Sequence, residues 1–143
     1  MSMWTYVIGC ILIDTMAETN DIKAYVEKII EKAPKITGSE QDIDIFINQL
    51  SGHNVSIMKG GSLECEEYQT CAAITLVGSL RDREIEYTKK EIGNFLKFID
   101  NNFLIYDMGL HLSDGHNNID ISIDKDTENL NLKKDKEERN GYN

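Results

Sequence analysis

The sequence predicts a mixed α+β domain, namely a ferredoxin-like βαββαβ sandwich with an additional C-terminal strand and a charged tail. Residues 4–15 and 70–78 are apolar at odd and even positions alike, as in strands covered on both faces. Two other segments repeat apolar residues at helical spacing, and three alternate apolar with polar residues. In this order, right-handed crossovers place both helices on one sheet face and the first and third strands centrally. Another open α+β sheet is the alternative.

The length of 143 residues suits one domain with a proper core. We expect residues 1–124 to form this α+β domain. Residues 125–143 hold five basic and five acidic residues and few large apolar ones, which is typical of a flexible tail or one ordered by a partner. Because this tail has no net charge, the formal charge of −10 belongs to the folded body.

The first helix is predicted after the first strand. Apolar residues recur at helical spacing from Ile22 to Ala33, and residues 19–21 supply capping oxygens before them. Pro34 is the only proline, and we expect the helix to end there.

The next strand is predicted at residues 42–48, where isoleucines alternate with polar residues and Phe46 is the exception. The alternation predicts Ile43, Ile45 and Ile47 beneath the helices and Asp42 and Asp44 on a wet face. Such a strand is typical of a sheet edge. Residues 51–68 are rich in Gly, Ser and Glu and indicate a long connection or an irregular hairpin.

The second helix and a final hairpin follow. Apolar residues at helical spacing end at Ile99, and either Asp82 or a capping box at Thr88 marks the start of the helix. In residues 104–112 the even-numbered residues are mainly apolar, and residues 119–123 alternate isoleucine with polar residues. We expect these two strands to form a hairpin that turns at Asp114-Gly115.

Composition indicates the cellular location of the protein and the class of partner that it binds. The apolar run at residues 7–13 is far shorter than the roughly 20 residues that cross a bilayer, and it lacks a basic leader. The acidic charge disfavours nucleic acid and anionic membranes and favours a partner with a basic surface. We therefore expect a cytoplasmic protein of the host cell. Cys10 is predicted as a core residue, and Cys65 and Cys71 as free thiols rather than zinc ligands.

Asp42 and Asp44 are the first candidate site. On one strand face they lie roughly 7 Å apart, and together with His53 they would suit a hard cation. The interpretation that we favour is a solvated edge strand, because acids from distant segments would have to converge to make a specific metal site. Gly52-His53-Asn54 and its echo Gly115-His116-Asn117 are typical turn residues. We therefore expect no catalytic residue, no metal site and no cofactor.

Arg81 and Arg83 are the second candidate site. They lie where a central strand enters a helix, so they would suit a carboxylate or phosphate at the helix N-terminus. Acidic neighbours at residues 82, 84 and 86 favour local ion pairs instead.

Three segments carry a resemblance: TGSEQDIDIFINQLSGHN from Thr37, EYQTC from Glu67, and GSLRDREIEYTKKEI from Gly78. With them, residues 4–113 resemble small uncharacterised proteins encoded by phages and prophages of Gram-positive bacteria. The tail and much of residues 56–66 do not match. The resemblance implies a viral accessory role and transfers no catalytic residues.

These observations yield three functional hypotheses. The first is an inhibitor of a host defence system, such as an anti-CRISPR-like protein whose acidic surface blocks a nucleic-acid-binding site. The second is a protein that sequesters a nucleotide signal with Arg81, Arg83 and His53 at a homo-oligomer interface. The third is a metal-dependent enzyme that uses Asp42, Asp44 and His53. For the inhibitor, the predicted partner-binding residues are Asp42, Asp44, Glu64, Glu66 and Glu67.

Overall fold

The computed structural model describes residues 3–15, 17, 19, 21–50, 54–58 and 65–123. In residues 54–58 and 65–69 it describes the backbone alone. The predicted tail at residues 125–143 lies outside the described residues.

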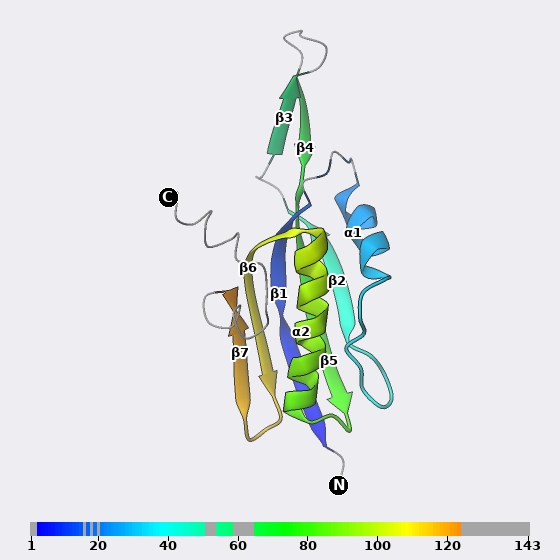
Figure 1. Cartoon of the computed structure of the whole chain (residues 1–143), viewed down its shortest axis with the longest axis vertical. Coiled ribbons are helices and arrows are strands. Elements are labelled where there is room, and N and C mark those ends of the chain that lie inside the picture. The colour runs from blue at the N-terminus through cyan, green and yellow to red at the C-terminus, as the bar shows by residue number, and fades with distance from the viewer. Residues whose placement is uncertain are drawn as a thin grey trace.

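The main sheet has five strands in the order β2-β5-β1-β6-β7, and every neighbouring pair is antiparallel. The strands are β1 (Trp4–Asp14), β2 (Asp44–Gln49), β5 (Cys71–Arg81), β6 (Leu104–Ser113) and β7 (Asn118–Ser122). The two helices, α1 (Ile22–Ile30) and α2 (Ile85–Asn102), lie on the same side of this sheet (Figure 1). The predicted α+β class, the pairing of the two most apolar strands and the one-sided helical layer are confirmed.

The core lies between the helices and the sheet. In β2 and just before it, Ile43 and Ile47 are buried, Ile45 packs against them partly buried, and Asp44 is exposed. The alternation of apolar and polar residues therefore predicted correctly which face of this strand is buried. Burying one such isoleucine contributes about 2 to 3 kcal/mol to the free energy of unfolding.

The opposite side of the sheet has no described helix over it (Figure 1). In β1 the side chains of Val7, Ile11 and Ile13 are buried, whereas Ile8 is 60% exposed. The prediction that this strand is covered on both faces is wrong, and Cys10 is half-buried on the uncovered face rather than in the core. The sequence pattern anticipates a second covering layer that the described chain does not supply.

A β-bulge changes the phase of β6. The pairing of β1 with β6 shifts between Leu12 and Ile13, so that Leu12 pairs with Asp107 and Ile13 with Ile105. Ile105 is buried, as are the predicted inward residues from residue 108 onward, but Tyr106 is 37% exposed. The simple alternation predicted for residues 104–112 is therefore wrong before the bulge. The extra residue of the bulge reverses which side chains of the strand face the core.

Helix α2 begins at Ile85, and its N-cap Glu84 makes no side-chain capping bond. Neither predicted cap is used. Asp82 lies before the helix with a φ of 58°, and Thr88 is buried within the first turn with no hydrogen-bond partner for its hydroxyl group among the described residues.

A two-stranded arm is inserted between β2 and β5. Its strands are β3 (Asn54–Met58) and β4 (Cys65–Gln69), which pair antiparallel and extend beyond the end of the main sheet (Figure 1). Of the two alternatives predicted for this region, a long connection or an irregular hairpin, the structure shows the paired strands of a hairpin.

The turn between β6 and β7 is built on the Asp114 side chain, as predicted from Asp114-Gly115. Its Oδ1 accepts hydrogen bonds from the backbone N–H groups of His116 (2.9 Å) and Asn117 (2.6 Å), and Gly115 adopts a φ of 93°. These bonds stabilise the carboxylate and hold the pKa of Asp114 below its ordinary value, with the Asn117 backbone bond as the largest cause.

We expect the turn to weaken only in acid. Because the pKa of Asp114 is lower in the folded state than in the unfolded state, its contribution to stability is complete above the ordinary aspartate pKa. That contribution is lost as the pH falls through the lowered pKa. A carbon-detected NMR titration of the Asp114 carboxyl group should give a midpoint below that of a peptide spanning residues 111–120. Equal midpoints in the protein and the peptide would contradict this prediction.

Candidate functional site

The open face is the sheet surface opposite the helices, formed by the even-numbered residues of β1 and their neighbours on the other strands. Within the described residues, eight large hydrophobic side chains are exposed, and five of them lie on this face. These five are Tyr6 (49% exposed), Ile8 (60%), Phe46 (55%), Val77 (37%) and Tyr106 (37%). This clustering makes the open face the strongest candidate for a binding surface.

Strand register brings residues from all five strands into one row across the open face. The row is Asp44, Val77, Ile8, His111 and Asp120. Its two apolar members lie in the middle, on the central strands, and its carboxylates lie at the two sheet edges. A partner that contacts the apolar centre would therefore also meet acidic groups on either side.

Apart from Phe46, the adjacent row carries small side chains. It consists of Phe46, Thr75, Cys10, Gly109 and Ser122. A methyl group added to Gly109 would meet no atom of the described residues within 4 Å, so these residues leave the space above this strand open. Apart from Phe46, this row therefore leaves room for a partner's backbone or helix to approach.

Charge is distributed unevenly between the two layers. Asp44, Asp107 and Asp120 are exposed on the open face, and Asp120 Oδ1 lies 2.6 Å from His111 Nδ1. All seven lysines of the described residues lie instead in α1, in the segment directly after it, or in α2. The open face is therefore acidic and apolar, while the helical layer carries the lysines.

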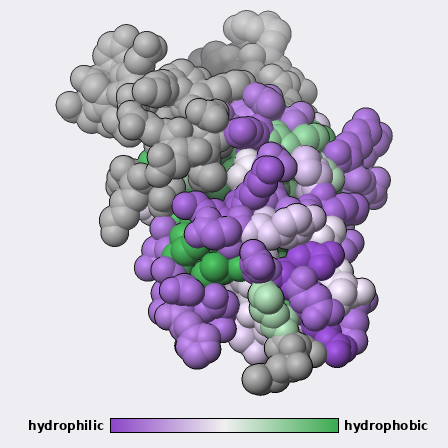
Figure 2. Space-filling view, turned by 60° about the horizontal axis from the view of Figure 1, so that its bottom comes forward, coloured by the Kyte–Doolittle hydropathy of each residue, from purple (hydrophilic) through white to green (hydrophobic). Residues whose placement is uncertain are grey.

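In Figure 2 the lower end of the molecule of Figure 1 is turned toward the viewer. Figure 2 shows a largely hydrophilic surface on which hydrophobic residues gather only in small patches. Exposed hydrophobic residues in small patches are normal on a protein surface.

Cys71, Asp14 and Tyr106 lie close together at one end of the open face. Cys71 pairs with Asp14 across β1 and β5, and its side chain is only 2% exposed. Burial and the nearby Asp14 carboxylate raise the pKa of the Cys71 thiol, and burial and interactions with Cys71 raise that of Tyr106. Both groups therefore stay protonated near neutral pH, so Cys71 lacks the thiolate character of a catalytic nucleophile.

The predicted partner-binding carboxylates are spread over several parts of the molecule. Asp44 lies on the open face, but Asp42 lines a cavity beside the helices. Glu66 and Glu67 lie in β4 of the arm, where only the backbone is described, and Glu64 lies outside the described residues. Glu66 lies eleven positions before Val77, the strand partner of Asp44, so the described residues do not unite this set on one patch.

Arg81 and Arg83 make local contacts. Arg81 pairs with Glu40 and lies over the Trp4 ring, with its guanidinium carbon 5.9 Å from the ring centroid. Arg83 donates to Thr37 Oγ1 and to the Asp82 carbonyl oxygen, and it lies over the Tyr87 ring. The contact of Arg81 Nε with Asp82 Oδ2 (3.9 Å) matches the predicted local ion pairs, whereas Glu40 and Thr37 are distant in the sequence. His53, the third residue of the proposed ligand site, lies outside the described residues.

Two further observations concern metals and membranes. Within the part of the chain that the structure describes, no three His, Cys, Asp or Glu side chains come close enough to hold a metal ion together. Neither described helix is long and apolar enough to span a membrane.

Sequence reasoning missed the apolar half of the candidate site. Ile8 and Val77 lie in strands that looked covered on both faces, so their exposure had no signal of its own. Phe46 did have one, because it interrupts an otherwise regular alternation with a large apolar residue at a polar position.

Comparison of the chain with known family models, curated proteins and solved structures gives no match in any of the three.

Proposed function

We propose that this protein acts by binding, and that it docks the open face of its sheet on a basic surface of a partner protein. The observation that carries the proposal is the row in which exposed Ile8 and Val77 are bracketed by Asp44 and Asp120. Protein interfaces commonly have an apolar centre and a polar rim. Apolar contacts would supply most of the affinity, and the carboxylates would select a basic partner.

Charge favours a basic partner over a second copy of the chain. Two copies that met through their open faces would bring together two acidic surfaces of proteins with a formal charge of −10 each. A partner rich in Lys and Arg would gain from the same carboxylates. It would also avoid the lysines, which lie in the helical layer.

The biological role that we propose is inhibition of a host defence system. A basic protein surface in such a system is typically a nucleic-acid-binding channel, as in a CRISPR effector nuclease. An acidic protein bound there would exclude the nucleic acid, and its association would slow as salt screens the charges. The protein would then work in the host cytoplasm without catalysis of its own.

The finer fold assignment belongs to the same proposal. We infer that the domain is a ferredoxin-like sandwich with β7 added at one edge and the arm inserted between β2 and β5. The inference is supported by the central place of β1, flanked by β5 and β6, and by two helices on one face. It explains why one face of the sheet is left for a partner.

The proposal predicts that apolar residues of the open face are needed for inhibition. In a DNA-cleavage assay with a purified host defence nuclease that the wild-type chain inhibits, the double variant Ile8→Ser/Val77→Ser should raise the inhibitory concentration about tenfold or more. Both residues are exposed, so the melting temperature should change little. Equal inhibition by variant and wild type would remove the open face as the binding surface. A panel of defence nucleases that are all unaffected by the wild type would reject the inhibitory role.

The carboxylates are tested with a matched pair of triple variants. Asp44→Asn/Asp107→Asn/Asp120→Asn should slow association by about three- to tenfold at low salt and less at high salt. Glu27→Gln/Glu31→Gln/Glu86→Gln makes the same charge change in the helical layer and should slow it much less. Equal effects of the two triples would mean that total charge matters and the open face does not.

The reactivity of Cys10 shows whether another part of the protein or a partner covers the open face. In a Cys65→Ser background, iodoacetamide should modify half-buried Cys10 and leave buried Cys71 intact, and the bound nuclease should protect Cys10. If Cys10 is already protected in the free protein and becomes reactive once residues 125–143 are deleted, the tail covers this face and the proposal fails.

A further inference from the structure

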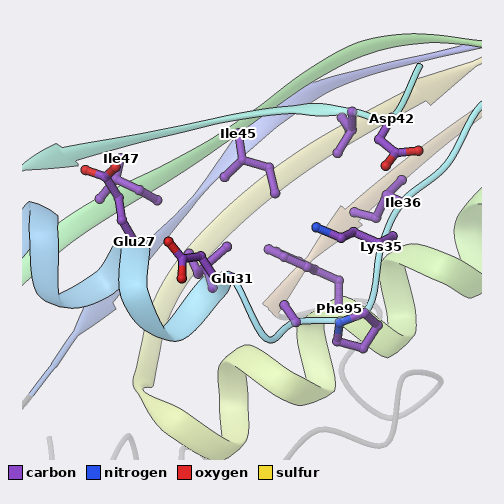
Figure 3. Close-up of a pocket in the computed structure, with 12 residues that line it drawn as sticks. Glu27, Glu31, Lys35, Ile36, Asp42, Ile45, Ile47 and Phe95 are labelled. Carbon is purple, nitrogen blue, oxygen red and sulfur yellow. The ribbon is translucent and has the colours of Figure 1, made fainter. Parts of the chain in front are cut away.

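A cavity of about 270 Å³ lies on the helical side of the sheet, away from the open face (Figure 3). Its walls come from α1, the segment at residues 31–36, β2 and α2. Helix α1 packs on β2 and α2 packs on β6, so the two helices lie over different parts of the sheet. The short α1 and its stop before Pro34 leave this space only partly filled.

The floor of the cavity is apolar and is formed by side chains from β2 and α2. Ile45 and Ile47 of β2 face it from the sheet, and Phe95 closes it from α2 (Figure 3). Phe95 is 0% exposed and Ile47 only 6% exposed, whereas Ile45 is partly exposed and open to a ligand. The remaining apolar lining residues are Ile30, Ala33, Pro34, Ile36 and Ile43. Such a floor would hold a compact hydrocarbon group.

The rim of the cavity is acidic. Glu27 lies on α1 and Glu31 is its C-cap residue, and both lie beside Ile47 and Ile45, while Lys35 and Asp42 lie at the other side (Figure 3). All four charged side chains are exposed. Three carboxylates against one ammonium group leave a net negative rim, which attracts a cation and repels a carboxylate or phosphate.

We propose that this cavity binds a small organic ammonium ion with a compact apolar body. The apolar body lies on the isoleucines and Phe95, and the ammonium group lies at the Glu27 and Glu31 carboxylates. The volume is just below the usual range of roughly 300–1,000 Å³ for ligand pockets, so the ligand is small. This site lies on the other side of the sheet from the proposed protein-binding face, and it goes beyond the proposed function.

Three six-carbon probes test both halves of the site. Hexylammonium, hexanol and hexanoate share the apolar body and differ in charge, and each is titrated into the full chain labelled at isoleucine methyl groups. Hexylammonium should shift the Ile45 and Ile47 resonances and bind most tightly, with hexanol weaker and hexanoate weakest. No shift with hexylammonium overturns the proposal, and so does equal or tighter binding of hexanol or hexanoate.

Two variants and one control variant separate the effect of charge from the effect of shape. Glu27→Gln/Glu31→Gln should weaken hexylammonium binding by about three- to tenfold and leave hexanol binding within about twofold. Glu86→Gln, on exposed α2 surface away from the cavity lining, should change neither. Ile45→Phe should fill the cavity and abolish binding of both probes, with retained folding checked by the unaffected methyl resonances of Ile11 and Ile121. Unchanged hexylammonium affinity in the double glutamine variant or in Ile45→Phe would overturn the site. Because no partner protein enters these titrations, their outcome is independent of the nuclease assays.

Discussion

Replacing Gly9 by alanine is expected to destabilise the domain by about 3 kcal/mol or more, because β1 and β6 approach too closely there for any side chain. A Cβ atom at Gly9 would lie 2.1 Å from the Gly109 carbonyl oxygen and 2.6 Å from Leu110 Cα. Both are backbone atoms, so relief requires one central strand to shift against its neighbour. Urea unfolding should show the loss as a lower midpoint with a similar slope.

Gly109→Ala is the matched control for this prediction. Gly109 lies in the same strand pair, but a Cβ atom there would meet nothing within 4 Å in the part of the chain that the structure describes. Alanine should change stability by less than about 1 kcal/mol, with a small gain expected from the reduced entropy of the unfolded chain. If both glycine variants unfold at the same urea concentration, the close approach of the strands at Gly9 is incorrect.

Truncating Phe95 to alanine is expected to cost about 3 to 5 kcal/mol of stability. Its ring lies in the middle of α2 at 0% exposure and packs in the core cluster between the helices and the sheet. Removing it deletes buried apolar contacts and joins new empty space to the adjacent cavity. The urea midpoint should fall further than for any single substitution on the open face.

Phe46→Ala makes the same chemical change on the uncovered side of the sheet. Phe46 is 55% exposed on an edge strand, so its truncation should alter stability by less than about 1 kcal/mol. It should nevertheless weaken partner binding under the proposed function. Comparable destabilisation by both substitutions would show that the face opposite the helices is buried in the folded protein.

Local patterns predicted most of the architecture. Alternation in residues 43–47 and 119–121 identified which isoleucines enter the core, because a half-buried strand must separate its polar and apolar residues by parity. Asp114 and Gly115 predicted their turn, because both residue types favour that backbone geometry for direct chemical reasons. These features depend on residues close together in the chain.

What could not be predicted depends on neighbours distant in the sequence. The bulge near Tyr106 arises from pairing with residues 12 and 13, about ninety positions earlier, and it reverses the faces of the residues before it. The exposure of Ile8 depends on whether another element covers the open face of the sheet. The sequence of its own strand does not determine this. The candidate site was therefore predicted as acidic, from Asp44, while its apolar centre emerged only from the register of five strands.

The arm at β3 and β4 has a consequence for how much this chain can vary. The backbone N–H of Leu50 donates to the Cys71 carbonyl oxygen at 3.0 Å, which closes the β2–β5 ladder at the base of the arm. Everything between these two residues is therefore topologically a single loop joining adjacent antiparallel strands. The entropic cost of closing such a loop rises by only about 0.6 kcal/mol for each doubling of its length. Insertions, deletions and wholesale replacement of the arm can accumulate there while the register of the sheet stays fixed.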